Sequence, residues 1–225
     1  MKTLITYEQK TTMNFKKTSY LFLAFLIGFS ITASAQSSIG LGLRAGVNLA
    51  NLSGGPYDLD SRTGLLAGAV LEYQTDAIPL EFETGLYYSQ KGAEGQYKET
   101  IIKGAYEGNA GTFKLDYIEI PVLAKYRFQM EGSLSPYLMA GPYLELNIGS
   151  EVKASKNVAY LEDISDEIRS SGFGVIFGAG SDLQLNGRRF NVQARYGLGI
   201  TPVFEERSDE GEKHSVISLT AGFRF

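Results

Sequence analysis

The strongest constraint on the fold is a period of two in hydrophobicity that recurs in eight segments after residue 36. Between Ile39 and Leu49, apolar residues occupy the odd positions, and glycine or polar residues occupy the even positions. Neighbouring side chains on a β-strand point to opposite faces, so this pattern predicts a strand with one apolar and one polar face. The same alternation is found in segments 64–74, 80–91, 113–128, 136–149, 172–185, 190–200 and 214–225.

The lengths of these segments and of their connections indicate how they close into a fold. The strands of soluble sheets usually have about 5 or 6 residues, whereas about 9 to 11 are needed to cross a bilayer obliquely, which every segment provides. The connections alternate between short ones at 75–79, 129–135 and 186–188 and long ones at 50–63, 92–112, 150–171 and 201–213. This asymmetry is typical of outer-membrane barrels. The sequence therefore predicts an all-β fold, an eight-stranded antiparallel up-and-down transmembrane β-barrel with both mature termini periplasmic.

Residues 1–35 differ from the rest and predict a cleaved signal peptide. Two lysines precede an apolar run at 20–32, which is followed by an Ala-Ser-Ala cleavage site. This order of regions is that of a secretory signal, and we expect cleavage before Gln36. Residues 36–225 then form the barrel domain. A retained anchor is the alternative, although the run is shorter than the roughly 20 residues of a transmembrane helix, and Met13 is an alternative start.

Charged residues are divided between the long connections and the polar faces of the strands. The long connections hold 15 acidic and 8 basic residues, and the rest of the chain after residue 35 holds nine of each sign. Partly desolvated charges need partners, so this balance favours a polar face that points into the barrel. The predicted lumen charge network comprises Arg44, Glu72, Glu81, Glu83, Glu119, Lys125, Arg127, Glu145, Asp182, Arg195 and Arg224, and Lys91 and Arg189 lie on the same faces.

The apolar faces carry aromatic residues at both ends of the strands. Tyr73, Phe82, Tyr126, Phe128, Phe190, Phe223 and Phe225 fall near the short connections, and Tyr88, Phe173 and Tyr196 near the long ones. Such girdles mark the two interfaces of a membrane, so we expect the apolar faces to contact lipid. A secreted soluble barrel that encloses an apolar ligand, as a lipocalin does, is the alternative.

Four short motifs lie along the predicted strands. They are Gly42-Leu43-Arg44-Ala45-Gly46-Val47-Asn48, Asp116-Tyr117-Ile118-Glu119-Ile120-Pro121 with Lys125-Tyr126, Ser135-Pro136-Tyr137 leading into Ala140-Gly141-Pro142, and the final Ala221-Gly222-Phe223-Arg224-Phe225. Together they resemble the PorT-like outer-membrane β-barrel family of Bacteroidota, and the likeness covers residues 40–225. The resemblance implies an outer-membrane barrel in which Phe225 is the signal read by the barrel-insertion machinery. It also implies a link to type IX protein secretion, with which PorT itself is associated.

Composition and motif geometry exclude several chemistries. The chain has no cysteine, and its net charge of −4 gives no basic face for nucleic acid. Gly40-x-Gly42-x-x-Ala45 nearly matches a dinucleotide fingerprint but lies inside a predicted strand, so no cofactor is expected. His214 is the only imidazole and adjoins Ser215, which points to the opposite face of a strand. We therefore predict no catalytic residues.

Two of the long connections have features of their own. The connection at 201–213 carries a cluster of acidic residues that could hold a cation between lipopolysaccharide phosphates, namely Glu205, Glu206, Asp209, Glu210 and Glu212. Their spacing matches no calcium loop, so we interpret them as a solvated loop and predict no metal site. Leu161, Ile164 and Ile168 recur at helical spacing and indicate a short amphipathic helix that packs on the barrel rim, with capping of the mouth as the alternative.

The predicted function follows from the width of such a barrel. Eight strands enclose just enough space for their own side chains, so an open channel is not expected. We predict a non-enzymatic outer-membrane protein with a structural, adhesive or partner-contact role through four extracellular loops. The expected partners are outer-membrane lipid and lipopolysaccharide, the barrel-insertion machinery, and an envelope or extracellular protein, without nucleic acid. An accessory role in secretion or narrow solute passage is the alternative, and an envelope hydrolase comes third.

Overall fold

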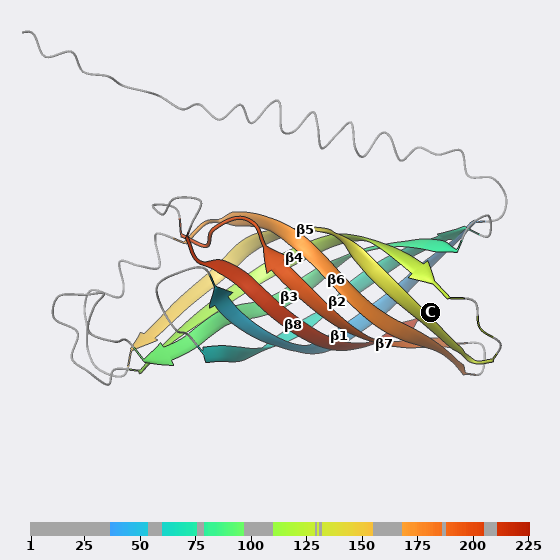
Figure 1. Ribbon diagram of the computed structural model, residues 1–225, viewed down its shortest axis with the longest axis horizontal. Helices are drawn as coiled ribbons and strands as arrows, with labels where there is room; N and C mark the ends of the chain where they lie inside the picture. Colours follow the sequence, from blue (N-terminus) through green and yellow to red (C-terminus); the bar gives the residue numbers. More distant parts are fainter. Residues whose placement is uncertain are drawn as a thin grey trace, which may run out of the picture. The chain divides into compact units, whose positions relative to one another are not determined.

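A computed structural model describes residues 37–53, 60–75, 79–96, 110–128, 130, 132–154, 168–185, 188–204 and 211–225. These residues form one closed barrel in which every strand pairs antiparallel with its sequence neighbours and the last strand pairs with the first (Figure 1). The predicted eight-stranded antiparallel barrel is confirmed. The strands are β1 (Ser37–Ser53), β2 (Asp60–Thr75), β3 (Leu80–Gln96), β4 (Ala110–Arg127), β5 (Leu134–Ala154), β6 (Ser171–Leu185), β7 (Arg188–Gly199) and β8 (Lys213–Arg224).

The barrel begins and ends at the same edge. Ser37 of β1 pairs with Thr75, and Arg224 of β8 pairs with Arg189. The first and the last strand residues of the barrel therefore both lie on the side of the short connections. The predicted signal peptide at 1–35 lies outside the described residues. No helix in the described part of the chain is long and apolar enough to cross a membrane.

The two faces of each strand separate by polarity as the alternation requires. On β1, the outward Leu41 and Leu43 are 59% and 56% exposed, whereas the inward Arg44 and Asn48 are 2% and 0% exposed. Large hydrophobic side chains are exposed on all eight strands, and the charged side chains of the polar faces are buried except for the partly exposed Arg127, Arg189 and Arg224. The barrel is therefore apolar outside and polar inside, the reverse of a soluble globular protein.

Polar residues mark where the outward apolar band ends, on the side of the long connections. On β1 the apolar face runs from Ile39 to Leu49 and is followed by Asn51. On β3 and β4 the band ends where Tyr88 donates a hydrogen bond to Asp116 (2.9 Å) and receives one from Gln90 (2.9 Å). The band on β1 is thus 11 residues long, which suits an oblique crossing of a bilayer.

Five strands, β1 to β5, continue beyond this band, so the predicted bounds of the long connections are wrong. The β3–β4 ladder reaches Gln96 and Ala110, and the β4–β5 ladder reaches Gly111 and Ala154. The connections are 54–59, 97–109, 155–170 and 200–212, so the first three are shorter than predicted, and the fourth is shifted by one residue without a change of length. Hydrophobic alternation stops where lipid contact stops, whereas backbone pairing continues, and this is why the sequence pattern ended too early.

Two irregularities lie in the ladders of β4. The β4–β5 register shifts between Asp116 and Tyr117, which is a β-bulge with Ile148 of β5 as the extra residue. The β3–β4 ladder passes from the Thr84 pair to the Tyr87 pair without a shift and leaves Pro121 unpaired on that side, as expected of a residue without an N–H. The hydroxyl of Thr84 instead donates to the carbonyl oxygen of Pro121 at 2.8 Å.

Three groups of buried apolar and aromatic side chains lie in the interior. Two of them, which we call together the apolar belt, come from β2 to β6: one comprises Leu66, Val70 and Tyr87, and the other comprises Leu123, Tyr137, Met139, Tyr143 and Ile176. The apolar cap consists of Leu52, Ala93, Leu115, Tyr117, Ile168, Val203 and Phe204. The cap draws on the ends of β1, β3 and β4 and on the segments before β6 and after β7, so it lies at the mouth on the side of the long connections.

Backbone bonds tie the cap segments together. Ile168 and Phe204 form an isolated β-bridge, the N–H of Arg169 donates to Val203 (2.8 Å), and that of Val203 donates to Glu212 (2.9 Å). Residues 161 and 164 of the predicted amphipathic helix lie outside the described residues. Ile168 packs inside the mouth, so at this position capping, rather than the rim packing we favoured, describes the structure.

Candidate functional site: the charged interior of the barrel

The inward charged side chains form two clusters, and on β3 and β4 a residue of the apolar belt lies between them. On β3, Tyr87 of the belt lies between Glu83 and Lys91, and on β4, Leu123 lies between Lys125 and Glu119. The turn-side cluster comprises Arg44, Glu72, Glu81, Glu83, Lys125, Arg127, Asp182, Arg189 and Arg224. The loop-side cluster comprises Lys91, Glu119, Glu145 and Arg195.

Lys125 is the centre of the turn-side cluster. Glu72 and Glu83 lie directly opposite each other on β2 and β3, where two like charges would repel. The ammonium of Lys125 contacts both, at 2.9 Å from Glu72, and reaches Glu81 at 3.2 Å. Arg44 contacts Glu83 as well and donates to the hydroxyl of Tyr87 at 2.9 Å. The opposed carboxylates are therefore neutralised from within the lumen.

Arginines close the turn-side cluster toward the barrel end. Arg127 bridges Glu81 (2.6 Å) and Asp182 (2.5 Å), and Arg189 approaches the same two carboxylates at 3.7 and 3.8 Å. Both arginine side chains are slightly exposed, at 15% and 18%, whereas the two carboxylates are buried. This cluster thus reaches from the middle of the barrel to its turn-side rim.

One ion pair of the turn-side cluster crosses the seam at which the barrel closes. Arg224 of β8 reaches over β1 to Glu72 of β2, with Nη1 3.4 Å from Oε2. The path passes Gly40, where a Cβ would lie 1.8 Å from Nε of Arg224. A residue without a side chain at position 40 is therefore required for the arginine to lie there.

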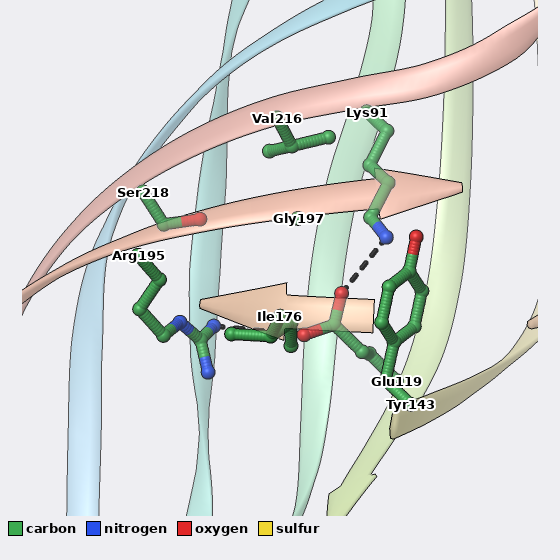
Figure 2. A pocket seen from close by; sticks show the side chains of 8 residues that line it. All are labelled: Lys91, Glu119, Tyr143, Ile176, Arg195, Gly197, Val216 and Ser218. Carbon is green, nitrogen blue, oxygen red and sulfur yellow. Dashed lines mark ion pairs between the residues drawn. The ribbon is translucent and has the colours of Figure 1, made fainter. Parts of the chain in front are cut away.

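The loop-side cluster repeats the same arrangement on a smaller scale. Glu119 and Glu145 are directly opposite on β4 and β5, and the ammonium of Lys91 lies 2.8 and 2.7 Å from their carboxylates. The same ammonium lies 4.7 Å from the ring centroid of Tyr143, a cation–π contact. Arg195 approaches Glu119 at 3.5 Å and lies over the ring of Tyr87. Figure 2 shows Lys91 and Arg195 on either side of Glu119.

The structure brings every residue of the predicted lumen charge network into one of these clusters, together with Lys91 and Arg189. The turn-side cluster has five cations and four carboxylates, and the loop-side cluster has two of each. Sequence reasoning did not assign the aromatic partners Tyr87, Tyr117, Tyr137 and Tyr143, although all four lie on polar faces. Their position on the polar faces could have identified them from the sequence, because an aromatic ring in a charged lumen offers cation–π contacts.

His214 is placed for packing rather than for hydrolysis. It is 1% exposed, and its Nε2 lies 3.1 Å from the hydroxyl of Tyr117 in the apolar cap. The neighbouring Ser215 points outward, where its hydroxyl lies 2.9 Å from that of Tyr196. The two residues therefore do not form a nucleophile–base pair.

The remaining candidate residues are Phe225 and the acidic residues near the end of the chain. Phe225 is 76% exposed, its N–H donates to the carbonyl of Leu41 at 2.9 Å, and its ring lies 5.2 Å from that of Phe223. Of the acidic residues near the end of the chain, 205–210 lie outside the described residues, and Glu212 is buried. Within the described residues, no group of three or more His, Cys, Asp or Glu side chains could hold a metal ion.

A closed antiparallel barrel with an apolar exterior and an ion-paired interior defines the class of transmembrane β-barrel proteins. The family can be stated as well. The chain belongs to the outer membrane protein beta-barrel domain family, whose model matches residues 34–205. The protein is therefore an outer-membrane β-barrel protein, which identifies the apolar faces of its strands as the surface in contact with lipid.

The fold is similar to that of a solved small outer-membrane barrel. The crystal structure of Neisserial surface protein A matches with a TM-score of 0.52 and 19% identity, over 84% of this chain and 97% of that one. The outer membrane protein OprG from Pseudomonas aeruginosa matches with a TM-score of 0.48 and 14% identity, over the same shares. Comparison with curated proteins finds no similar sequence.

Proposed function

We propose that this protein is a sealed, non-enzymatic surface protein of the outer membrane that acts through its long connections. In this proposal the long connections are extracellular and both mature termini are periplasmic. The connections serve adhesion, maintain envelope integrity or bind an envelope or extracellular protein. The barrel anchors them in the membrane among lipid and lipopolysaccharide. The barrel-insertion machinery recognises the chain through Phe225.

The observation that carries this proposal is the filling of the lumen. Along β3 and β4, inward residues of the turn-side cluster, the apolar belt, the loop-side cluster and the apolar cap follow one another. Moving an ion through such a sequence of layers requires breaking buried ion pairs and then entering apolar surroundings, and both steps are costly. Function is therefore assigned to the ends of the barrel rather than to its interior.

Conductance measurement separates this proposal from solute passage. We expect the purified protein to insert into planar bilayers without steps of conductance, under conditions in which an open porin gives them. Defined steps that depend on protein concentration would overturn the sealed-barrel proposal and favour narrow solute passage. Loss of protein export in a strain that lacks the protein, with conductance still absent, would instead favour the accessory role in secretion that the PorT-like resemblance implies.

The surface role has a direct test in intact cells. Each long connection is shortened in turn to a Gly/Ser linker, and surface cross-linking and cell attachment are compared with those of the unaltered protein. We expect at least one shortened variant to lose cross-links or attachment while its barrel still shows heat-modifiable migration on gels. Unchanged cross-linking and attachment in all four variants would contradict the proposal.

An envelope hydrolase is tested by one substitution. His214→Ala removes the only imidazole of the chain. We expect phospholipid and lipid A to remain unhydrolysed by both the unaltered protein and this variant. Hydrolysis by the unaltered protein that the variant loses would overturn the non-enzymatic assignment.

A further inference from the structure

A small cavity lies inside the loop-side cluster. Its lining comes from β3 to β8 and consists of Lys91, Glu119, Tyr143, Ile176, Arg195, Gly197, Val216 and Ser218 (Figure 2). The cavity has a volume of about 10 Å³, which is room for about one water molecule. Tyr143 and Ile176 of the apolar belt form part of its wall, and the charged groups of Lys91, Glu119 and Arg195 and the hydroxyl of Ser218 form the rest of its polar lining.

Hydrogen-bond donors at this cavity lack protein partners. Nε and Nη1 of Arg195 and the hydroxyl of Tyr143 are buried and bond to nothing in the part of the chain that the structure describes. Each of the two residues is only 3% exposed. The remaining nitrogen of the guanidinium, Nη2, lies 3.5 Å from Glu119. Unpaired buried donors of a charged group are costly, so the cavity calls for a hydrogen-bond acceptor.

The other wall groups decide which acceptor fits. The hydroxyl of Ser218 donates to Oδ1 of Asn48 at 2.8 Å, so its own lone pairs are free to accept. The carboxylate of Glu119 is a further acceptor. The formal charges of the loop-side cluster already balance, and Glu119 would repel an anion. A ligand that accepts from Arg195 and also donates to oxygen, within the volume of one water molecule, is water itself.

We propose that this cavity binds a single ordered water molecule that accepts from Arg195 and donates to Ser218, and that completes the loop-side cluster. Tyr143 provides the third polar contact. The site is a structural part of the barrel interior, because residues of six strands, β3 to β8, line it. A water molecule held there exchanges slowly with solvent, unlike the water of an open channel.

Substitution of Gly197 tests whether the cavity is empty or holds water, because the two cases predict opposite effects on the stability of the barrel. A Cβ built there meets no atom closer than 3.8 Å, so an alanine fits its protein surroundings but takes space in the cavity. If the cavity is dry, Gly197→Ala fills it and stabilises the barrel. If it holds the proposed water, the methyl group displaces it, leaves Arg195 unpaired and raises the unfolding equilibrium constant about 10-fold.

The experiment uses the protein purified in detergent and measures reversible urea unfolding. The control is Gly149→Ala, where a Cβ also meets nothing closer than 3.8 Å but does not line the cavity. We expect Gly149→Ala to change the unfolding constant less than about 3-fold. In an Arg195→Met background, where no guanidinium needs a partner, Gly197→Ala is expected to lose its destabilising effect.

Relaxation dispersion of water nuclei counts long-lived internal water directly. We expect the unaltered protein to show one more long-lived water molecule than Gly197→Ala and the same number as Gly149→Ala. Stabilisation by Gly197→Ala together with an unchanged count would overturn the proposal. An anomalous bromide signal beside Arg195 in crystals grown with sodium bromide would also overturn it, since the ligand would then be an anion.

Discussion

At the scale of single residues, two buried lysines neutralise glutamates that face each other inside the barrel. Lys125 and Lys91 each bridge a pair of glutamates that face each other across neighbouring strands. Removing one member of a buried ionic group leaves uncompensated charge, which costs more than the net stabilisation the group provides. The lysines are therefore required by the carboxylates around them, whatever the net contribution of the whole cluster.

Replacement of the central lysine tests this requirement. Lys125→Met keeps the length of the side chain but leaves Glu72, Glu81 and Glu83 without their shared cation. We expect the free energy of unfolding, measured by urea titration in vesicles, to fall by about 3–5 kcal/mol.

The matched control is Lys114→Met on the same strand. Lys114 pairs with Glu151 at 3.3 Å, and their side chains are 34% and 55% exposed. An exposed pair of this kind contributes about 1 kcal/mol or less, so the control is expected to change little. Equal losses in the two variants would show that the turn-side cluster does not depend on Lys125.

At the scale of strands, the barrel must close one seam between β1 and β8. Besides the backbone ladder, the pair of Arg224 with Glu72 spans this seam because Gly40 leaves the path open. Gly40→Ala displaces the arginine, so it is expected to destabilise the unaltered protein and to have little effect in an Arg224→Met background. The coupling energy in this double-mutant cycle is expected to be about 0.5–3 kcal/mol. Additive effects of the two substitutions would contradict the role of Gly40.

Strand orientation is tested by charge on the outward face. Leu43 lies midway along the apolar band of β1, and Asn51 lies just beyond its end. In vesicles, Leu43→Arg is expected to lower the free energy of unfolding by about 2–4 kcal/mol, and Asn51→Arg by about 1 kcal/mol or less. Insensitivity at position 43 would show that the face does not contact lipid.

Alternation along the strands was sufficient to predict their number, their order and the face of each side chain. It failed at the loop-side ends of β1 to β5, where backbone pairing continues beyond the outward apolar band, and it could not locate the bulge beside Asp116. The inward direction of Lys91 was predictable, but its contacts with Glu119 and Glu145 were not. Those contacts depend on the stagger between strands, which is set by the closure of the whole barrel and not by local pattern.

At the scale of the whole molecule, the apolar outer surface and the charged interior decide whether the folded protein is stable in water or only in lipid or detergent. Apolar side chains such as Leu41, Leu86, Val192 and Leu219 are exposed around the entire outer surface. A continuous apolar surface of this extent leads to association in water unless lipid or detergent covers it. The filled interior contributes nothing to solubility, since its charges are paired with one another.

We therefore expect the folded protein to be monodisperse in sedimentation only when detergent is present, and to enter preformed lipid vesicles when detergent is diluted. Folding is monitored by faster migration of the unheated sample on gels, because a closed barrel resists unfolding by SDS. The inverse arrangement, a soluble barrel with an apolar interior, predicts a clear monomeric solution without detergent. Such a solution would contradict the orientation of every strand, since the ion pairs of Arg44, Lys91 and Lys125 would then have to lie outside.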